Sequence, residues 1–280
     1  MRFNKAQIII IAVLLGMVVI LVYLNFKTPE STIAQAVAPS GERLQKQFDF
    51  NEYLSGLKDS LSSEANQRIQ EQTQLAKAPD AGVFTLLNLA NTWDSLHFRM
   101  VSAFYLTQLA ARVNDENSWF NAGLKYYEFA ATCQDTSMQV YAANQAIFAF
   151  EKVVMLNENN LEAKNALANC YIQTSSDIMK AVQLLKDVTN RDSFNVEAHY
   201  TLGMLSMRSG QWDKAITRFE KCVAIQPFNA EYHYFLGEAY SQSGKKNEAI
   251  REFETFRGLV PDEEVKKNID ITINKLKNTK

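Results

Sequence analysis

Two stretches near the end of the chain decide the fold. Residues 198–228 read AHYTLGMLSMRSGQWDKAITRFEKCVAIQPF, and residues 232–262 read YHYFLGEAYSQSGKKNEAIREFETFRGLVPD. The residues that they share, each 34 positions apart, are Gly203 and Gly237, Gly210 and Gly244, Ala215 and Ala249, Phe219 and Phe253, and Pro227 and Pro261. Self-similarity at one fixed period indicates a protein built from stacked structural repeats.

Each copy has the residues needed for a hairpin of two antiparallel helices. Gly203 and Ala215 are small, so the backbones of the two helices can approach closely. Gly210 is expected to end the first helix, and Pro227 is expected to end the second. A single hairpin cannot bury its apolar face, so the units are expected to stack on one another.

The period and the residue types resemble those of the tetratricopeptide repeat. The Leu-Gly pair and the Ala of the second helix match the family pattern, whereas His199 and His233 occupy its first aromatic position. The resemblance implies an all-α fold, a right-handed superhelical solenoid of antiparallel helix pairs. It also implies a protein that binds other proteins and is not an enzyme. Both histidines are interpreted as core residues that replace an aromatic ring.

The repeat pattern can be followed over residues 84–277. The predicted units are a degenerate repeat at 84–115, an expanded repeat at 116–159, three clear repeats at 161–194, 196–229 and 230–262, and a capping helix at 263–277. The expanded repeat has extra residues before Ala146, which are expected to lengthen its helix pair. The capping helix is expected to cover the apolar end of the stack.

The N-terminal segment is strongly apolar. Residues 8–24 read IIIIAVLLGMVVILVYL, long enough for a helix of about 25 Å. Residues 1–27 are therefore predicted to be a transmembrane signal-anchor; a cleaved signal peptide is the alternative, but its core is usually shorter. Arg2 and Lys5 precede the run, which favours a cytoplasmic N-terminus and a repeat domain outside the cytoplasm.

Two further segments connect this anchor to the repeats. Residues 28–48 are rich in small and polar residues and are predicted to be a flexible linker. Residues 49–78 place Leu54, Leu61 and Ile69 on one stripe, which predicts a single amphipathic helix. This helix is expected either to form a coiled-coil stalk that makes a homodimer or to pack on the repeat domain.

The composition gives no sign of a reaction centre. The 280 residues carry a net charge of −2, so nucleic acid is not an expected partner. Cys133, Cys170 and Cys222 have no metal-binding spacing and are interpreted as small buried apolar residues. No phosphate-binding loop, nucleophile elbow, dinucleotide fingerprint or zinc-protease motif is present in the sequence. We therefore predict no catalytic residue, no cofactor and no metal.

The resemblance implies that the first helix of each repeat lines a concave groove. The residues expected to face the groove are Phe120, Leu124, Tyr127, Asn165, Asn169, Gln173, Tyr200, Met204, Arg208, Tyr234 and Glu238. Asn165 and Asn169 are expected to hydrogen-bond an extended peptide backbone, because an amide side chain is both donor and acceptor. Tyr200, Met204 and Tyr234 are expected to hold apolar side chains of the partner, and to point to solvent without it.

These observations together predict a membrane-tethered scaffold that binds other proteins through its groove. The architecture resembles that of bacterial inner-membrane tetratricopeptide proteins, which implies a periplasmic repeat domain. Accessory roles in secretion, envelope assembly or cytochrome c maturation are all compatible with it. A structural tether or dimeric stalk without a specific groove ligand is the alternative. Arg208 is the only basic residue among the groove positions, which argues against the basic clamp that chaperone-tail-binding members of the family use.

Overall fold

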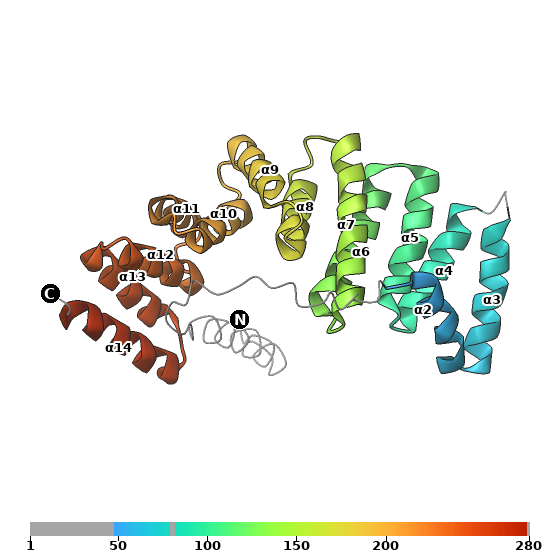
Figure 1. Cartoon of the computed structure of the whole chain (residues 1–280), viewed down its shortest axis with the longest axis horizontal. Helices are drawn as coiled ribbons and strands as arrows, with labels where there is room; N and C mark the ends of the chain where they lie inside the picture. Colours follow the sequence, from blue (N-terminus) through green and yellow to red (C-terminus); the bar gives the residue numbers. More distant parts are fainter. Residues whose placement is uncertain (1–47, 79–81, 279–280) are drawn as a thin grey trace, which may run out of the picture. The chain divides into compact units, whose positions relative to one another are not determined.

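A computed structural model of the chain describes residues 48–78 and 82–278. These residues form helices and no strands, so the all-α prediction is confirmed (Figure 1). The α-helices are α2 (Phe50–Gly56), α3 (Ser63–Lys77), α4 (Val83–Ser95), α5 (Arg99–Val113), α6 (Glu116–Thr132), α7 (Thr136–Leu156), α8 (Leu161–Thr174), α9 (Ile178–Arg191), α10 (Val196–Arg208), α11 (Trp212–Ile225), α12 (Ala230–Gln242), α13 (Lys246–Leu259) and α14 (Glu263–Asn278).

From α4 to α13 the helices pack in pairs that follow the chain. Helix α4 packs on α5, α6 on α7, α8 on α9, α10 on α11 and α12 on α13, and each pair contacts the next (Figure 1). Helix α14 packs on α13, where Ile269 and Ile273 join Ala249 and Phe253 in one apolar cluster. The expected capping helix therefore covers an apolar surface of the last pair.

A glycine on the first helix of a pair faces a phenylalanine on the second. A Cβ atom on Gly203 would lie 2.8 Å from the ring of Phe219, and one on Gly237 would lie 2.7 Å from the ring of Phe253. Both phenylalanines are fully buried. The Gly and Phe that recur in the sequence are thus the two sides of one contact, which lets the helices pack closely.

The ends of the first helices are also set by recurring residues. Asn160, Asn195 and Asn229 precede α8, α10 and α12, and each side chain accepts a hydrogen bond from a backbone N–H of the first turn. Gly210 and Gly244 follow α10 and α12 with φ angles of 68° and 80°. This left-handed conformation is easily reached only by glycine, and it turns the chain into the second helix.

The prediction of a single helix over residues 49–78 is wrong. Helix α2 ends at Gly56, a 3-10 turn covers Leu57–Ser60, and Ser62 caps a separate helix α3. Ser62 accepts a hydrogen bond from the backbone N–H of Ala65. This bond caps the first turn of α3, so a new helix starts here instead of α2 continuing.

Both parts of this segment pack on the repeat pairs. Helix α3 contacts α4 and buries Ile69 and Ala76. The ring of Phe50 lies 4.6 Å from that of Phe104 and 5.7 Å from that of Tyr141, measured between centroids. Of the two expected arrangements, the structure has the one in which the segment packs on the helical domain.

The pair α6–α7 is longer than those that follow it. Helices α6 and α7 have 17 and 21 residues, whereas α10 and α11 have 13 and 14. The extra residues before Ala146 therefore extend regular helix on both sides of the turn rather than forming a loop.

None of the helices in residues 48–78 and 82–278 combines the length and the apolar character needed to cross a bilayer. The predicted anchor, residues 1–27, and the predicted linker up to residue 47 lie outside the described residues. Phe48, the last residue assigned to the linker, packs against Tyr53 and Tyr141, with ring centroids 5.5 and 5.1 Å apart.

Candidate functional site: the first-helix face

The predicted groove residues all lie on α6, α8, α10 and α12, the first helices of four successive pairs. We call the surface that they form the first-helix face. Asn165 is buried, and Gln173 and Arg208 are exposed. The half-buried residues of the set are Phe120, Leu124, Tyr127, Asn169, Tyr200, Met204, Tyr234 and Glu238. The structure thus places these residues on neighbouring helices, but they differ in how accessible their side chains are to a partner.

Asn165 and Asn169 on α8 are both engaged with the following repeat. The Nδ2 atom of Asn165 donates to Asn195 Oδ1 at 3.0 Å and to Glu197 Oε2 at 3.4 Å. The Nδ2 atom of Asn169 donates to Glu197 Oε1 at 3.0 Å. The expectation that Asn165 is free to bind a peptide backbone is therefore wrong, because the side chain is buried and its donor is used within the domain.

Tyr200 has the same kind of bond one repeat later. Its hydroxyl donates to Glu231 Oε1 at 2.7 Å, and its ring centroid lies 5.6 Å from that of Tyr232 and 5.8 Å from that of Phe235. Burial and the nearby Glu231 carboxylate raise the pKa of Tyr200. The expectation that this ring points to solvent is wrong, since it joins two first helices and covers part of the core.

Glu197 and Glu231 also occupy positions expected to face the groove, although they were not among the residues predicted to bind a partner, and they accept these interhelical bonds. Glu197 lies two positions after Asn195, and Glu231 lies two positions after Asn229. Both asparagines cap their helices. The repeated Asn-x-Glu was a readable signal in the sequence. It gives the first-helix face a hydrogen-bonded link from α8 to α10 and from α10 to α12.

The α12 end of the face is different, because its carboxylate is not engaged. Glu238 is half-buried and makes no hydrogen bond or ion pair within the described residues, and burial raises its pKa. Tyr234 packs on Phe253 and Phe256, with centroids 6.1 and 5.3 Å apart. Burial and the Glu238 carboxylate raise the pKa of Tyr234 to about 12.

The α6 end of the face is apolar and largely packed. Phe120 lies 5.6 Å from the Phe150 ring between centroids, and Leu124 and Tyr127 pack against the same core. Burial raises the pKa of Tyr127. These residues support the helix pairs while leaving part of each side chain at the surface.

The two histidines are core residues, as predicted. His199 is 4% and His233 6% exposed. His199 Nε2 lies 3.1 Å from the carbonyl oxygen of Ser193, and burial lowers the pKa of this histidine. His233 lies between the Pro227 carbonyl, 2.9 Å from Nε2, and Glu252 Oε2, 2.7 Å from Nδ1.

The cysteines follow the prediction in two cases out of three. Cys170 and Cys222 are buried, and burial raises the pKa of each thiol to about 12. Cys133 is only half-buried, because it follows the last residue of α6 where the chain turns to α7. In the part of the chain that the structure describes, no group of His, Cys, Asp and Glu side chains is arranged to hold a metal ion.

Comparisons with known proteins agree with the repeat architecture. A family model described as "TPR repeat" matches residues 205–244, and one described as "Anaphase-promoting complex, cyclosome, subunit 3" matches residues 139–222. No curated protein is similar to the chain by sequence search.

Several solved structures are similar. A crystal structure of MamA is 21% identical, with a TM-score of 0.53, and the match covers 63% of this chain and 91% of that one. Residues 41 to the end of MamA from Desulfovibrio magneticus RS-1 are 19% identical, with a TM-score of 0.53 and coverage of 63% and 94%. YrrB, described as a TPR protein with an unusual peptide-binding site, is 16% identical, with a TM-score of 0.53 and coverage of 71% and 97%.

The helix pairs, the repeated contacts and these matches define an all-α solenoid of the tetratricopeptide-repeat type. The prediction of an all-α solenoid of this type is thereby confirmed for the repeat helices. At these identities the similar structures establish the fold, and the function has to be argued from the residues of this chain.

Proposed function

We propose that this protein binds a segment of another protein on the first-helix face, with its strongest contacts at the α10–α12 end. The observation that carries the proposal is the Glu238 carboxylate, which is half-buried and has no partner within the described residues. Met204 and Tyr234, on the same two helices, offer half-buried apolar surface. A segment with a positively charged side chain next to an apolar one fits this combination. The positive charge would pair with the partly desolvated carboxylate of Glu238.

The rest of the face supports this site by being fixed in advance. The bonds from Asn169 to Glu197 and from Tyr200 to Glu231 join three first helices before any partner arrives. A surface that is already ordered loses less conformational entropy on binding. The peptide-binding site named for the similar protein YrrB is consistent with a binding role for this type of solenoid. Within this proposal the chain acts as a scaffold and not as an enzyme.

We further propose that residues 8–24 tether the repeat domain to a membrane, as a signal-anchor with a cytoplasmic N-terminus. The support is the apolar run of the sequence and the preceding Arg2 and Lys5. In a bacterial cell this arrangement places the repeats on the periplasmic side of the inner membrane. A reporter that is active only outside the cytoplasm, fused after Lys280, is expected to be active. Activity of a cytoplasmic reporter instead would reverse the orientation.

The binding proposal is tested by proximity labelling with the full-length chain in cells. Proteins labelled by the wild type are compared with those labelled by Glu238→Gln and by Tyr234→Ala. A matched control is Glu158→Gln, which removes an exposed carboxylate from the turn before α8. We expect both face variants to lose a labelled partner that the control retains, and Glu238→Gln to weaken the purified complex by about tenfold, since a charge-assisted hydrogen bond is lost.

The opposite result is equally informative. If both face variants keep every partner while their thermal unfolding matches the wild type, the first-helix face is not the binding surface. The chain would then act as a spacer, or bind through another surface. If a partner is lost only from Tyr234→Ala, the contact lies at the Tyr234 ring. The Glu238 carboxylate would then not take part in binding.

A further inference from the structure

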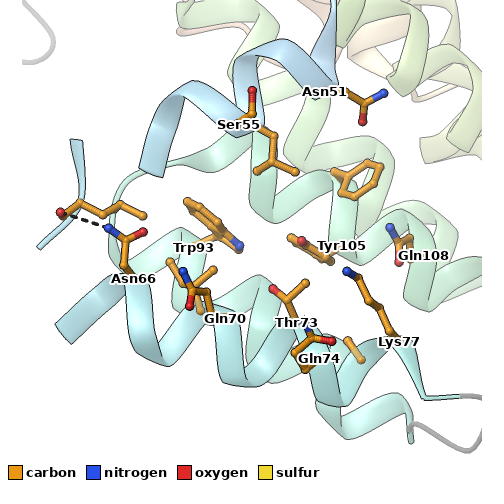
Figure 2. A pocket seen from close by; sticks show the side chains of 15 residues that line it. Asn51, Ser55, Asn66, Gln70, Thr73, Gln74, Lys77, Trp93, Tyr105 and Gln108 are labelled. Atoms are coloured by element: carbon orange, nitrogen blue, oxygen red, sulfur yellow. Dashed lines mark hydrogen bonds between the residues drawn. The ribbon is translucent and has the colours of Figure 1, made fainter. Parts of the chain in front are cut away.

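A cavity of about 440 Å³ lies outside the first-helix face, where α2 and α3 pack on α4 and α5. We call it the N-terminal pocket (Figure 2). It is lined by Asn51, Leu54, Ser55, Leu61, Asn66, Ile69, Gln70, Thr73, Gln74, Ala76, Lys77, Trp93, Phe104, Tyr105 and Gln108. Its volume falls in the range of about 300–1,000 Å³ that is typical of ligand-binding sites.

The lining divides into an apolar base and a polar rim. Trp93, Ile69 and Ala76 are buried and form part of the base. The rim has carboxamides from three helices, among them Asn51 of α2, Gln74 of α3 and Gln108 of α5 (Figure 2). Carboxamide side chains donate and accept hydrogen bonds at once, as a peptide group does, so a rim of this kind can pair with a peptide backbone.

The base contains a hydrogen-bond donor that no residue of the described ranges satisfies. Trp93 is 2% exposed, and its indole Nε1 has no hydrogen-bond partner within residues 48–78 and 82–278. In Figure 2 the nitrogen of the Trp93 ring lies on the side of the ring that faces Tyr105, another residue that lines the pocket. Buried donors are almost always paired in folded proteins, so an unpaired one beside a cavity indicates that a ligand supplies the acceptor.

The indole nitrogen of Trp93 is itself buried, so a ligand reaches it only after neighbouring side chains move. The nitrogen is covered by neighbouring side chains, but Gln70 and Gln74, which line the pocket from α3, are exposed and have long flexible side chains. The ligand group that meets this nitrogen must be a hydrogen-bond acceptor, such as a carbonyl oxygen, because the Trp indole offers a donor alone. The charged member of the lining is Lys77, so a basic ligand is disfavoured and an uncharged or acidic one is accepted.

We propose that the N-terminal pocket binds a short, non-basic peptide segment with an apolar side chain. A backbone carbonyl of this segment accepts the hydrogen bond of Trp93 Nε1, the apolar side chain lies on Ile69, and the carboxamides of Gln74 and Gln108 bind the remaining peptide groups. The site lies on α2 to α5 and shares no residue with the proposed binding end on α10 and α12, so each proposal stands or fails without the other.

The probe is a random hexapeptide library with acetylated N-termini and amidated C-termini, selected on the full-length protein. The tightest selected peptide is then titrated against three variants. Ser55→Trp places a large ring at the exposed rim and is expected to abolish binding. Gln74→Ala is expected to weaken binding about five- to tenfold. Gln67→Ala removes an exposed amide of the same helix that does not line the pocket, and is expected to bind like the wild type.

The donor is followed directly by the nuclear magnetic resonance signals of the indole N–H groups, with Trp93→Phe identifying the signal of Trp93. On addition of the peptide this signal is expected to move downfield and to exchange more slowly with solvent. Failure to select any peptide, or selected peptides that bind Ser55→Trp and Gln74→Ala normally, would overturn the proposal. A Trp93 signal that is already bonded in the wild type and is released by deleting residues 28–47 would make the chain its own ligand, and would also overturn it.

Discussion

Substitution of Gly237 tests why glycine recurs opposite phenylalanine in successive repeats. Close packing of the two helices is one explanation, and a backbone conformation that needs glycine is the other. A Cβ atom at this position would lie 2.7 Å from Phe253 Cε1 and 2.8 Å from Cδ1. Phe253 is fully buried, so its ring has little room to move. Overpacking of this kind costs about 1–3 kcal/mol. Replacing a helical Gly by Ala also gains about 1 kcal/mol of helix propensity. Gly237→Ala is therefore expected to lose up to about 2 kcal/mol, and Gly237→Leu more.

The chain has a matched control in Gly258, near the end of α13. A Cβ atom there would meet nothing within 4 Å, so Gly258→Ala keeps the gain in helix propensity without the clash. The two Gly→Ala variants are thus expected to shift the urea midpoint, followed by circular dichroism, in opposite directions. Phe253→Leu should also reduce the cost of Gly237→Ala, since the two side chains are in contact.

The reasoning is refuted if Gly237→Ala raises the midpoint as Gly258→Ala does. In that case the second helix moves away at little cost, and the fully buried phenylalanine does not fix the distance between the helices. A loss that Phe253→Leu leaves unchanged would place the clash elsewhere.

Three other expectations follow from contacts described above. Asn195→Ala removes a cap that also holds Asn165, so a loss of about 1 kcal/mol or more is expected in urea unfolding. Deleting residues 263–280 uncovers the apolar surface of α13 and should give concentration-dependent association in sedimentation. The lowered pKa of His199 means that the unfolded state binds its proton first, so stability falls as pH drops below about 6.5; His199→Gln should flatten this slope between pH 7 and 5.

The repeated helix pairs could be predicted from the sequence because each pair is made by local residues. Gly203 and Phe219 lie 16 positions apart, and the same spacing returns at Gly237 and Phe253. The burial of His199 was predictable for the same reason, since repeat position fixes which way a side chain points.

The break between α2 and α3 was harder to predict, because Leu54, Leu61 and Ile69 keep a helical spacing across it. Only the capping bond of Ser62 shows where a new helix starts. The sequence also does not show which residues of the first-helix face are already hydrogen-bonded within the domain. Tyr200 and Tyr234 occupy the same repeat position, but only Tyr200 has a glutamate of a following first helix within hydrogen-bond distance.

The N-terminal pocket had no signal in the sequence at all. Its residues come from α2, α3, α4, α5 and the segment between α2 and α3, and no spacing relates Asn51, Gln74, Trp93 and Gln108. A cavity of this kind depends on how non-repeating helices pack, whereas the repeat pattern describes only how each unit meets its neighbour.

Asn195 Oδ1 serves two helices at once, and this has a consequence for how the domain opens. The atom accepts the backbone N–H of Ala198 at 3.1 Å, which caps α10, and the Nδ2 of Asn165 at 3.0 Å, which belongs to α8. The start of α10 is therefore held partly by a residue of the preceding unit. Fluctuations that detach α8 should loosen the first turn of α10 as well, so opening would advance along the chain as a front. In native-state hydrogen exchange, the amide of Ala198 is then expected to exchange together with the amides of α8 and not with those at the end of its own helix.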